Sequence, residues 1–476
     1  MKKYIIQFSV ALLSLTSCMS DNINDDPNSP YTTVPETLVS YAQKELSDYM
    51  NTPNVNTNNF RLTMQYWQES TYVDESNYDF INRNVSNNIW SNNYVNVLMN
   101  LNQAKNIINN YVPTASEVAT WNKKKANQLA IIDIMMVYVY QNMVDTFGNI
   151  PYSESLQVGE HSLPKYDDAS QVYINLIERL KVDISSLNTA NSFGSGDYYY
   201  QGNVSKWRKF GNSLLLKLGI AIADSNSALA QSTVNSAILG GVMTSSADDC
   251  KLNYLATSPN YNPLYQNLAA SGRDDFFAGK TLVDYMLSKS DSRISSYFGS
   301  VDGEYVGGEI GQPGEFEEFS SIGDFAYTPD TPGVIMNHTE VAFYLAEAAA
   351  RWDSANAEVK YNEAVKASFK EWGVENESDA YLIANPYDAS NWKKSIGEQA
   401  WVAMFNQGHT SWNFYRRLDY PILSAPATAV ANAENKVPVR MTYPVREQSV
   451  NSTNWESAST AIGGDKLTTK LFWDKF

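Results

Sequence analysis

The sequence is poor in the residues that usually build metal and nucleophile sites. Its 476 residues include only three histidines and two cysteines. His161, His338 and His409 stand far apart, and neither HExxH nor CxxC occurs, so a zinc site is not expected. The patterns GxSxG and GxxxxGK[ST] are also absent, which gives no support to a nucleophile elbow or a phosphate-binding loop. We therefore predict no metal and no cofactor.

Positive charge is scarce as well. Lysine and arginine total 35 against 52 aspartates and glutamates, which gives a formal charge of -17. Nucleic-acid binding needs a basic surface, so we expect no nucleic-acid partner. Carboxylate pairs are available in any acidic chain, and a surface glycoside hydrolase therefore stays open as an alternative. The densest acidic cluster, Glu315, Glu317 and Glu318, is interpreted as a solvated loop face and, less favoured, as a divalent-cation site.

Long hydrophobic runs are missing except at the start of the chain. Lys2 and Lys3 precede an apolar run from Tyr4 to Leu15, which is followed by Thr16-Ser17-Cys18. A basic start, a short apolar stretch and small residues are typical of a secretory signal peptide, and the run is too short to span a membrane. The sequence LTSC resembles a bacterial lipobox, so Cys18 is predicted to carry lipid.

This interpretation divides the chain into three parts. Residues 1–17 are the lipoprotein signal peptide, and residues 18–30 form a flexible acidic tether, because they are polar and have little to bury. Residues 31–476 form a single body. With Cys18 lipidated, Cys250 has no disulfide partner and is expected to be a small buried hydrophobe.

Helical periodicity dominates the body. From Ile89 to Gly148 apolar residues recur three or four apart, which predicts two amphipathic helices separated at Pro113. Ser116 can cap the second helix, and Gly148 is placed to end it. The second helix is apolar nearly all round, as expected of a helix buried in a core.

Further helical hairpins are predicted near 169–223 and 340–372, with another helix near 395–405. The fold class is therefore mainly α, with tetratricopeptide-like helical hairpins and long irregular loops that form a ligand-binding half. The C-terminal part, 412–476, is poor in helical periodicity.

Two loop-rich regions, near 51–85 and 250–335, are the candidate binding regions. The segment 299–333 alone holds eight of the 24 glycines, which excludes a regular helix. Between Phe60 and Phe80, aromatic rings alternate with carboxylates and amides, a pattern that suits contact with a sugar or a side chain. For each ring taken singly, core packing explains it at least as well. The candidate ligand-binding residues are Trp67, Tyr72, Asp74, Arg83, Tyr261 and Tyr305.

Several short segments, in their order along the chain, resemble one family. They are the LTSC start, Val144 to Tyr152 (VDTFGNIPY), Trp207 to Ala223, Arg273 to Phe276 (RDDF), Met441 to Pro444 (MTYP) and Leu471 to Asp474 (LFWD). Together they resemble the SusD/RagB family of nutrient-binding outer-membrane lipoproteins, in its SusD-like subgroup. The resemblance covers essentially the whole chain.

The resemblance implies a non-catalytic binding protein that is lipid-anchored to the outer membrane and faces the cell exterior. Its partner would be a SusC-like TonB-dependent transporter, to which it would deliver oligosaccharide. Three hypotheses follow: capture of a glycan, capture of a peptide on the same scaffold, and a surface glycoside hydrolase.

Overall fold

The structure is a computed structural model that describes residues 33–476. The predicted signal peptide, the lipidation of Cys18 and the tether lie outside the described residues. Among residues 33–476, no helix combines the length and the apolar run needed to cross a bilayer.

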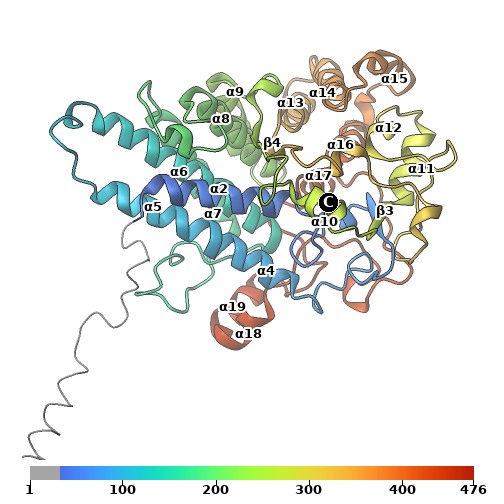
Figure 1. Ribbon diagram of the computed structural model, residues 1–476, viewed down its shortest axis with the longest axis horizontal. Helices are drawn as coiled ribbons and strands as arrows, with labels where there is room; N and C mark the ends of the chain where they lie inside the picture. Colours follow the sequence, from blue (N-terminus) through green and yellow to red (C-terminus); the bar gives the residue numbers. More distant parts are fainter. Residues whose placement is uncertain (1–32) are drawn as a thin grey trace, which may run out of the picture. The chain divides into compact units, whose positions relative to one another are not determined.

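Paired helices form most of the body, so the predicted mainly α class with helical hairpins is confirmed. The first set surrounds α6 (Figure 1). It comprises α2 (Pro35–Asn51), α4 (Val85–Ser91), the π-helix η1 (Asn92–Leu98), α5 (Met99–Asn110), α6 (Val118–Phe147), α7 (Ala169–Ser186), α8 (Val204–Ala221) and α9 (Ser227–Gly240). The second set comprises α13 (His338–Trp352), α14 (Ala357–Glu371), α15 (Ser378–Ala384), α16 (Trp392–Ala403) and α17 (Gly408–Leu418).

The central helix α6 follows the predicted pattern closely. Its side chains are buried without interruption from Ala130 to Phe147. Gly148 ends the helix with φ +85° and donates its N–H to Val144 O at 2.8 Å. This left-handed backbone region favours glycine because other residues have a Cβ that clashes there.

The start of α6 differs from the prediction. Glu117, and not Ser116, occupies the N-cap position. Its carboxylate accepts hydrogen bonds from Thr114 N at 2.9 Å and Thr114 Oγ1 at 2.7 Å. Ser116 is wrong as the cap because a turn held by Glu117 and Thr114 separates α5 from α6.

The C-terminal part contains three helices that its weak periodicity does not indicate: α17, α18 (Val445–Val450) and α19 (Ser452–Ala461). In α17 nearly every side chain is buried, including Arg416 and Arg417. A charged residue in a sequence usually indicates the solvent-facing side of a helix. Arginines at buried positions of a helix therefore interrupt the apolar pattern by which the helix would be recognised.

Segments carrying the family resemblance meet around the end of α6. Met441 N donates to Thr146 O at 2.9 Å, and Tyr443 OH donates to Asn149 O at 2.8 Å. Trp473 Nε1 donates to the buried carboxylate of Asp145 at 3.0 Å. The C-terminal segments therefore close the core around the end of α6, and their contribution is structural.

Two short antiparallel strand pairs join segments that are distant in sequence. Strand β1 (Trp67–Glu69) pairs with β3 (Phe276–Ala278), and β2 (Cys250–Leu252) pairs with β4 (Gly333–Met336). Cys250 is a free thiol and fully buried, as expected. The short helices α3 (Phe60–Thr63), α10 (Pro263–Leu268), α11 (Lys280–Ser288) and α12 (Ile294–Tyr297) lie among these loops, in the right-hand part of Figure 1.

Candidate ligand-binding site

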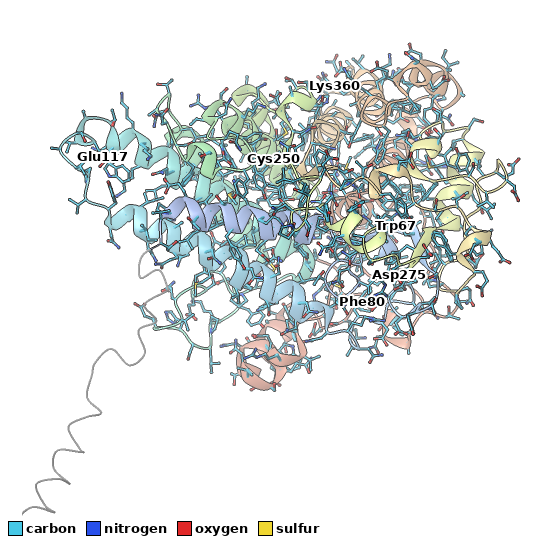
Figure 2. The ribbon with its side chains drawn as sticks, viewed as in Figure 1. Trp67, Phe80, Glu117, Cys250, Asp275 and Lys360 are labelled. Atoms are coloured by element: carbon cyan, nitrogen blue, oxygen red, sulfur yellow. The ribbon has the colours of Figure 1, made fainter. Side chains whose placement is uncertain are left out.

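Pairing of β1 with β3 brings the two predicted loop regions together around one cavity. Figure 2 labels Trp67 and Asp275 in this part of the molecule. The cavity has a volume of about 240 Å³. Its walls come from the loop after α2, from the turn after β1, and from the segment between α10 and β3. We refer to it as the first cavity.

Two of the predicted binding residues, Tyr72 and Arg83, line the first cavity. Tyr72 is 69% exposed, so its ring offers a broad face to a ligand. Arg83 is about one-third exposed and forms an ion pair from Nε to Glu75 Oε1 at 2.5 Å. An open ring beside a fixed guanidinium can combine stacking with directed hydrogen bonds.

Trp67 is placed differently from its prediction. It is 1% exposed, and its ring centroid lies 5.6 Å from that of Phe276 and 6.5 Å from that of Phe405. The Arg61 guanidinium lies 5.1 Å from the Trp67 ring centroid. Trp67 therefore has no face open to a ligand. It supports the cavity from behind, because the neighbouring Phe276 is a lining residue.

The other three candidates do not line the first cavity. Asp74 is exposed on the turn after β1. Tyr261 is half-buried, and its ring packs edge-to-face on Tyr265 with centroids 5.0 Å apart. Tyr305 is half-buried against the core. Their contact with a ligand stays a prediction.

The sequence analysis missed eight polar lining residues: Asn54, Asn56, Glu69, Ser70, Thr71, Asn267, Arg273 and Asp275. The Arg273 guanidinium binds the Asp275 carboxylate through two contacts, at 2.7 and 3.1 Å. The RDDF segment carries part of the family resemblance, and Asn54 and Asn56 lie in the predicted loop region 51–85, but neither pattern by itself indicates contact with a ligand. Amides and guanidinium groups supply the hydrogen bonds that orient hydroxyl-bearing ligands.

A buried carboxyl pair lies at the floor of the first cavity, where Glu69 is itself a lining residue and Glu75 is its neighbour. Glu69 is 3% exposed, and its Oε2 accepts from Ser76 N at 2.9 Å and Ser76 Oγ at 2.8 Å. Burial, followed by the charge of Glu75, raises the pKa of Glu69 to about 8. Burial also raises the pKa of Glu75, although Glu69 and Arg83 act against that shift. The pair therefore holds a proton at neutral pH.

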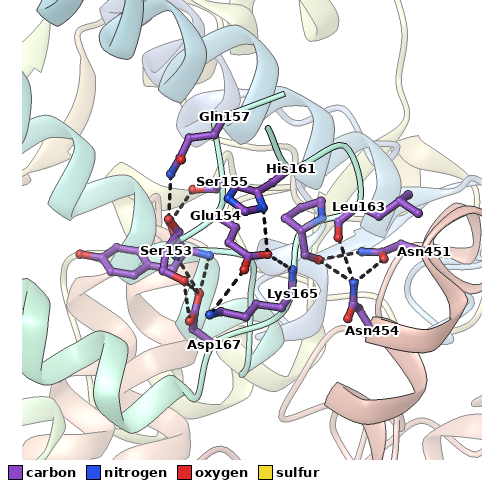
Figure 3. Close-up of polar contacts among 12 residues, drawn as sticks. Ser153, Glu154, Ser155, Gln157, His161, Leu163, Lys165, Asp167, Asn451 and Asn454 are labelled. Atoms are coloured by element: carbon purple, nitrogen blue, oxygen red, sulfur yellow. Dashed lines mark hydrogen bonds and ion pairs between the residues drawn. The ribbon is translucent and has the colours of Figure 1, made fainter. Parts of the chain in front are cut away.

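An apolar hollow of about 230 Å³ lies elsewhere, beside η1 and the loop that follows α6. Figure 3 shows how the loop is held: Asn451 Nδ2 donates to Pro164 O at 2.9 Å, and Asn454 Nδ2 donates to Leu163 O at 3.0 Å. Ser153 and Asp167 close the base of the same loop through further hydrogen bonds. The hollow shares no lining residue with the first cavity.

Within residues 33–476, no group of three or more histidine, cysteine, aspartate or glutamate side chains could hold a metal ion. Glu315, Glu317 and Glu318 are exposed, in agreement with a solvated face. The fold and the cavity thus define a helical-hairpin protein with a loop-built cavity as its candidate binding site.

The chain belongs to the SusD-like family. The family model described as starch-binding and associating with the outer membrane matches residues 27–444. Among curated proteins, no relative of the chain was found.

Solved structures support the same assignment. A chitin-binding protein is 25% identical, with a TM-score of 0.79, and the match covers 93% of this chain and all of that one. A SusD homologue from Bacteroides uniformis is also 25% identical, with a TM-score of 0.76 over 94% of this chain and all of the other. A chitin-binding SusD homologue from Flavobacterium johnsoniae, at 24% identity and a TM-score of 0.77, shares the fold over 92% of this chain and 98% of that chain.

Proposed function

We propose that the protein captures oligosaccharide in the first cavity and passes it to a SusC-like TonB-dependent transporter without breaking a bond in it. It would act from the outer face of the outer membrane, held there by lipid on Cys18. The family and its chitin-binding neighbour support glycan as the ligand class. The observation that carries the proposal is the largely exposed Tyr72 ring beside the asparagine and arginine side chains of one cavity.

A sugar ring has an apolar face and a rim of hydroxyl groups. The Tyr72 ring can take the face, while Asn54, Asn56 and Asn267 offer donors and acceptors to the rim. Carbohydrate hydroxyls can accept from Arg83 and Arg273 as well as donate to a carboxylate. Each contact is modest, so affinity in the micromolar range or weaker is expected, about -8 kcal/mol or less in magnitude.

The carboxylates of this cavity do not favour hydrolysis. Asp275 is held by Arg273, and Glu69 is buried with one oxygen bound to Ser76. A glycoside hydrolase needs an acid and a second carboxylate that face each other across the substrate. Incubating the purified protein with starch and chitin oligosaccharides should produce no new reducing ends. Release of reducing sugar by the wild type, abolished in Glu69→Gln, would overturn the non-catalytic proposal.

Tyr72 provides the direct test of the site. Calorimetric titration with malto- and chito-oligosaccharides should identify a glycan that binds the wild type. Tyr72→Ala should weaken that binding by about 1–2 kcal/mol, roughly 5- to 30-fold, because the stacking face is lost.

Tyr198→Ala is the matched control, since Tyr198 is 43% exposed and does not line the cavity. Equal affinity of Tyr72→Ala and Tyr198→Ala for the glycan would show that the binding site lies elsewhere.

A further inference from the structure

A second, larger cavity lies where the β2–β4 pair, the start of α13 and the end of α14 meet. Its volume is about 480 Å³, which falls within the usual range for small-molecule sites. It shares no lining residue with the first cavity. Like the first cavity, it is lined by charged side chains of both signs.

Four charged residues face the second cavity: Asp249, Lys251, Lys370 and Glu371. Within residues 33–476, no ion pair within 4.0 Å joins any of them to another side chain. Burial raises the pKa of Asp249 to about 6, although the hydrogen bond from His338 N and the charge of Lys251 act against that shift. Unpaired charges in a concave site are stabilised by a ligand that brings the opposite charges.

The two carboxylates are fixed near the first turn of α13. Asp249 Oδ1 accepts from His338 N at 2.8 Å, and Glu371 Oε1 accepts from Asn337 Nδ2 at 2.8 Å. Burial lowers the pKa of His338, so its imidazole adds no charge there at neutral pH. Burial raises the pKa of Glu371 to about 7, so this acidic end carries only part of its full charge at neutral pH and gains charge when an ammonium group binds.

The cations come from other walls of the cavity. Lys251 is paired with Val334 across the β2–β4 ladder, and both side chains face the cavity, as expected of directly opposed residues. Lys370 is exposed near the end of α14. Lys251 lowers the pKa of Asp249, so it lies on the acidic side, and Lys370 is the cation most accessible to an incoming anion.

An aromatic pair supplies apolar contact. Phe325 and Trp372 lie edge-to-face with ring centroids 5.3 Å apart, and both line the cavity. Trp372 Nε1 is buried and finds no acceptor among residues 33–476. An indole N–H at the wall of a cavity suits a carbonyl oxygen of a bound molecule.

We propose that the second cavity binds a small zwitterionic ligand of the kind represented by a short peptide with free ends. Its ammonium group lies against Asp249 and Glu371, its carboxylate lies against Lys370, and an apolar side chain packs on Phe325 and Trp372. The proposal does not depend on glycan capture, because the two cavities have no residue in common.

The test uses one peptide in three forms, titrated by calorimetry into the full chain. The probe is the tripeptide Ala-Phe-Ala with free ends, compared with its N-acetylated and its C-amidated forms. We expect the free peptide to bind and each blocked form to bind about tenfold more weakly or worse, because each lacks one charge-assisted contact.

Variants of the protein connect each loss to a residue. In Glu371→Gln, N-acetylation should reduce binding less than it does in the wild type, because only Asp249 still faces the ammonium group, whereas C-amidation should keep its full effect. In Lys370→Gln, C-amidation should reduce binding less than it does in the wild type, whereas N-acetylation should keep its full effect. Glu358→Gln is the matched control, because it lies at the other end of α14, about 20 Å away along the helix axis. Each variant is first checked for an unchanged thermal unfolding midpoint.

Failure of the free peptide to bind, or equal binding of all three forms, would overturn the proposal. So would loss of peptide binding in Tyr72→Ala, since Tyr72 belongs to the first cavity only. Binding of neutral oligosaccharide that is lost in Lys370→Gln and kept in Tyr72→Ala would instead assign the second cavity to glycan. Glycan capture at the first cavity is tested separately by Tyr72→Ala, and the outcome of that test does not depend on the peptide titrations.

Discussion

Charged side chains are placed differently in the core of the helical set and in the first cavity. In the helices, Glu347 is fully buried and contacts Arg417 at 2.7 Å and Arg351 at 2.9 Å, and Arg351 in turn contacts Asp224 at 2.8 Å. In the first cavity the Arg273–Asp275 pair is largely open to solvent. Charges inside the helical set fix one arrangement, whereas charges in the cavities stay available to a ligand.

Glu347 gives the largest expected effect. Glu347→Ala should lower the free energy of unfolding by about 3–5 kcal/mol, because Arg417 and Arg351 lose their buried partner. Urea denaturation measures the change. Glu304→Ala, an exposed glutamate in the loop-rich part, should change it by less than about 0.5 kcal/mol. If Glu347→Ala and Glu304→Ala lowered the free energy of unfolding by similar amounts, the two regions would not differ in how much their charges contribute to stability.

Trp67 tests whether a ring of the loop-rich part is structural. Trp67→Ala should cost about 3–5 kcal/mol of stability, because a large buried side chain is removed. Tyr72→Ala should cost less than about 0.5 kcal/mol, because its ring is exposed. Thermal or urea unfolding compares the two directly. If the Trp67→Ala variant kept the stability of the wild type but no longer bound glycan, Trp67 would be a ligand contact after all.

The carboxyl pair at the floor of the first cavity predicts a smaller, pH-dependent effect. Glu69 has a pKa of about 8 in the folded chain, above its unfolded value, so the folded state holds a proton that the unfolded state releases. Its contribution to stability is complete at low pH and is lost as the pH rises toward 8. The free energy of unfolding should therefore fall by about 1–3 kcal/mol more between pH 5 and pH 8 in the wild type than in Glu69→Gln.

The amide of Glu69→Gln mimics the protonated carboxyl and does not titrate, so it isolates this contribution. Glu317→Gln, an exposed variant, should follow the wild type across the same range. A wild type and a Glu69→Gln variant with parallel pH profiles would show that the carboxyl pair is ionised throughout.

Prediction of secondary structure from the sequence was accurate where a local preference, such as that of glycine for positive φ, decided the outcome by itself. The central helix α6 ended at Gly148, as its glycine indicated. It was less accurate where tertiary contacts decide. Arg416 and Arg417 hid the period of α17, because their burial depends on partners far away in the chain. The π-helix η1 also gave no signal in the apolar spacing.

The candidate site shows the same division. Tyr72 and Arg83 were predicted and line the first cavity, whereas Trp67 was predicted and is buried. The sequence identifies aromatic residues that suit contact with a ligand, but it does not show which of them are exposed. The pairing of β1 with β3 decides that Trp67 is buried. Asn267 and Arg273 could not be assigned beforehand, because nothing local shows that residues some 200 positions apart share a wall.

The sequence by itself determined the mainly helical class, the end of α6 and the family, because periodicity and C-terminal capping are local and the family segments follow one another in order along the chain. Only the tertiary structure decided which side chains face a cavity and which charges remain unpaired. Both depend on strand pairs and helix contacts between distant segments. The free energy of these contacts arises only when the segments meet, so it cannot be read from one segment alone.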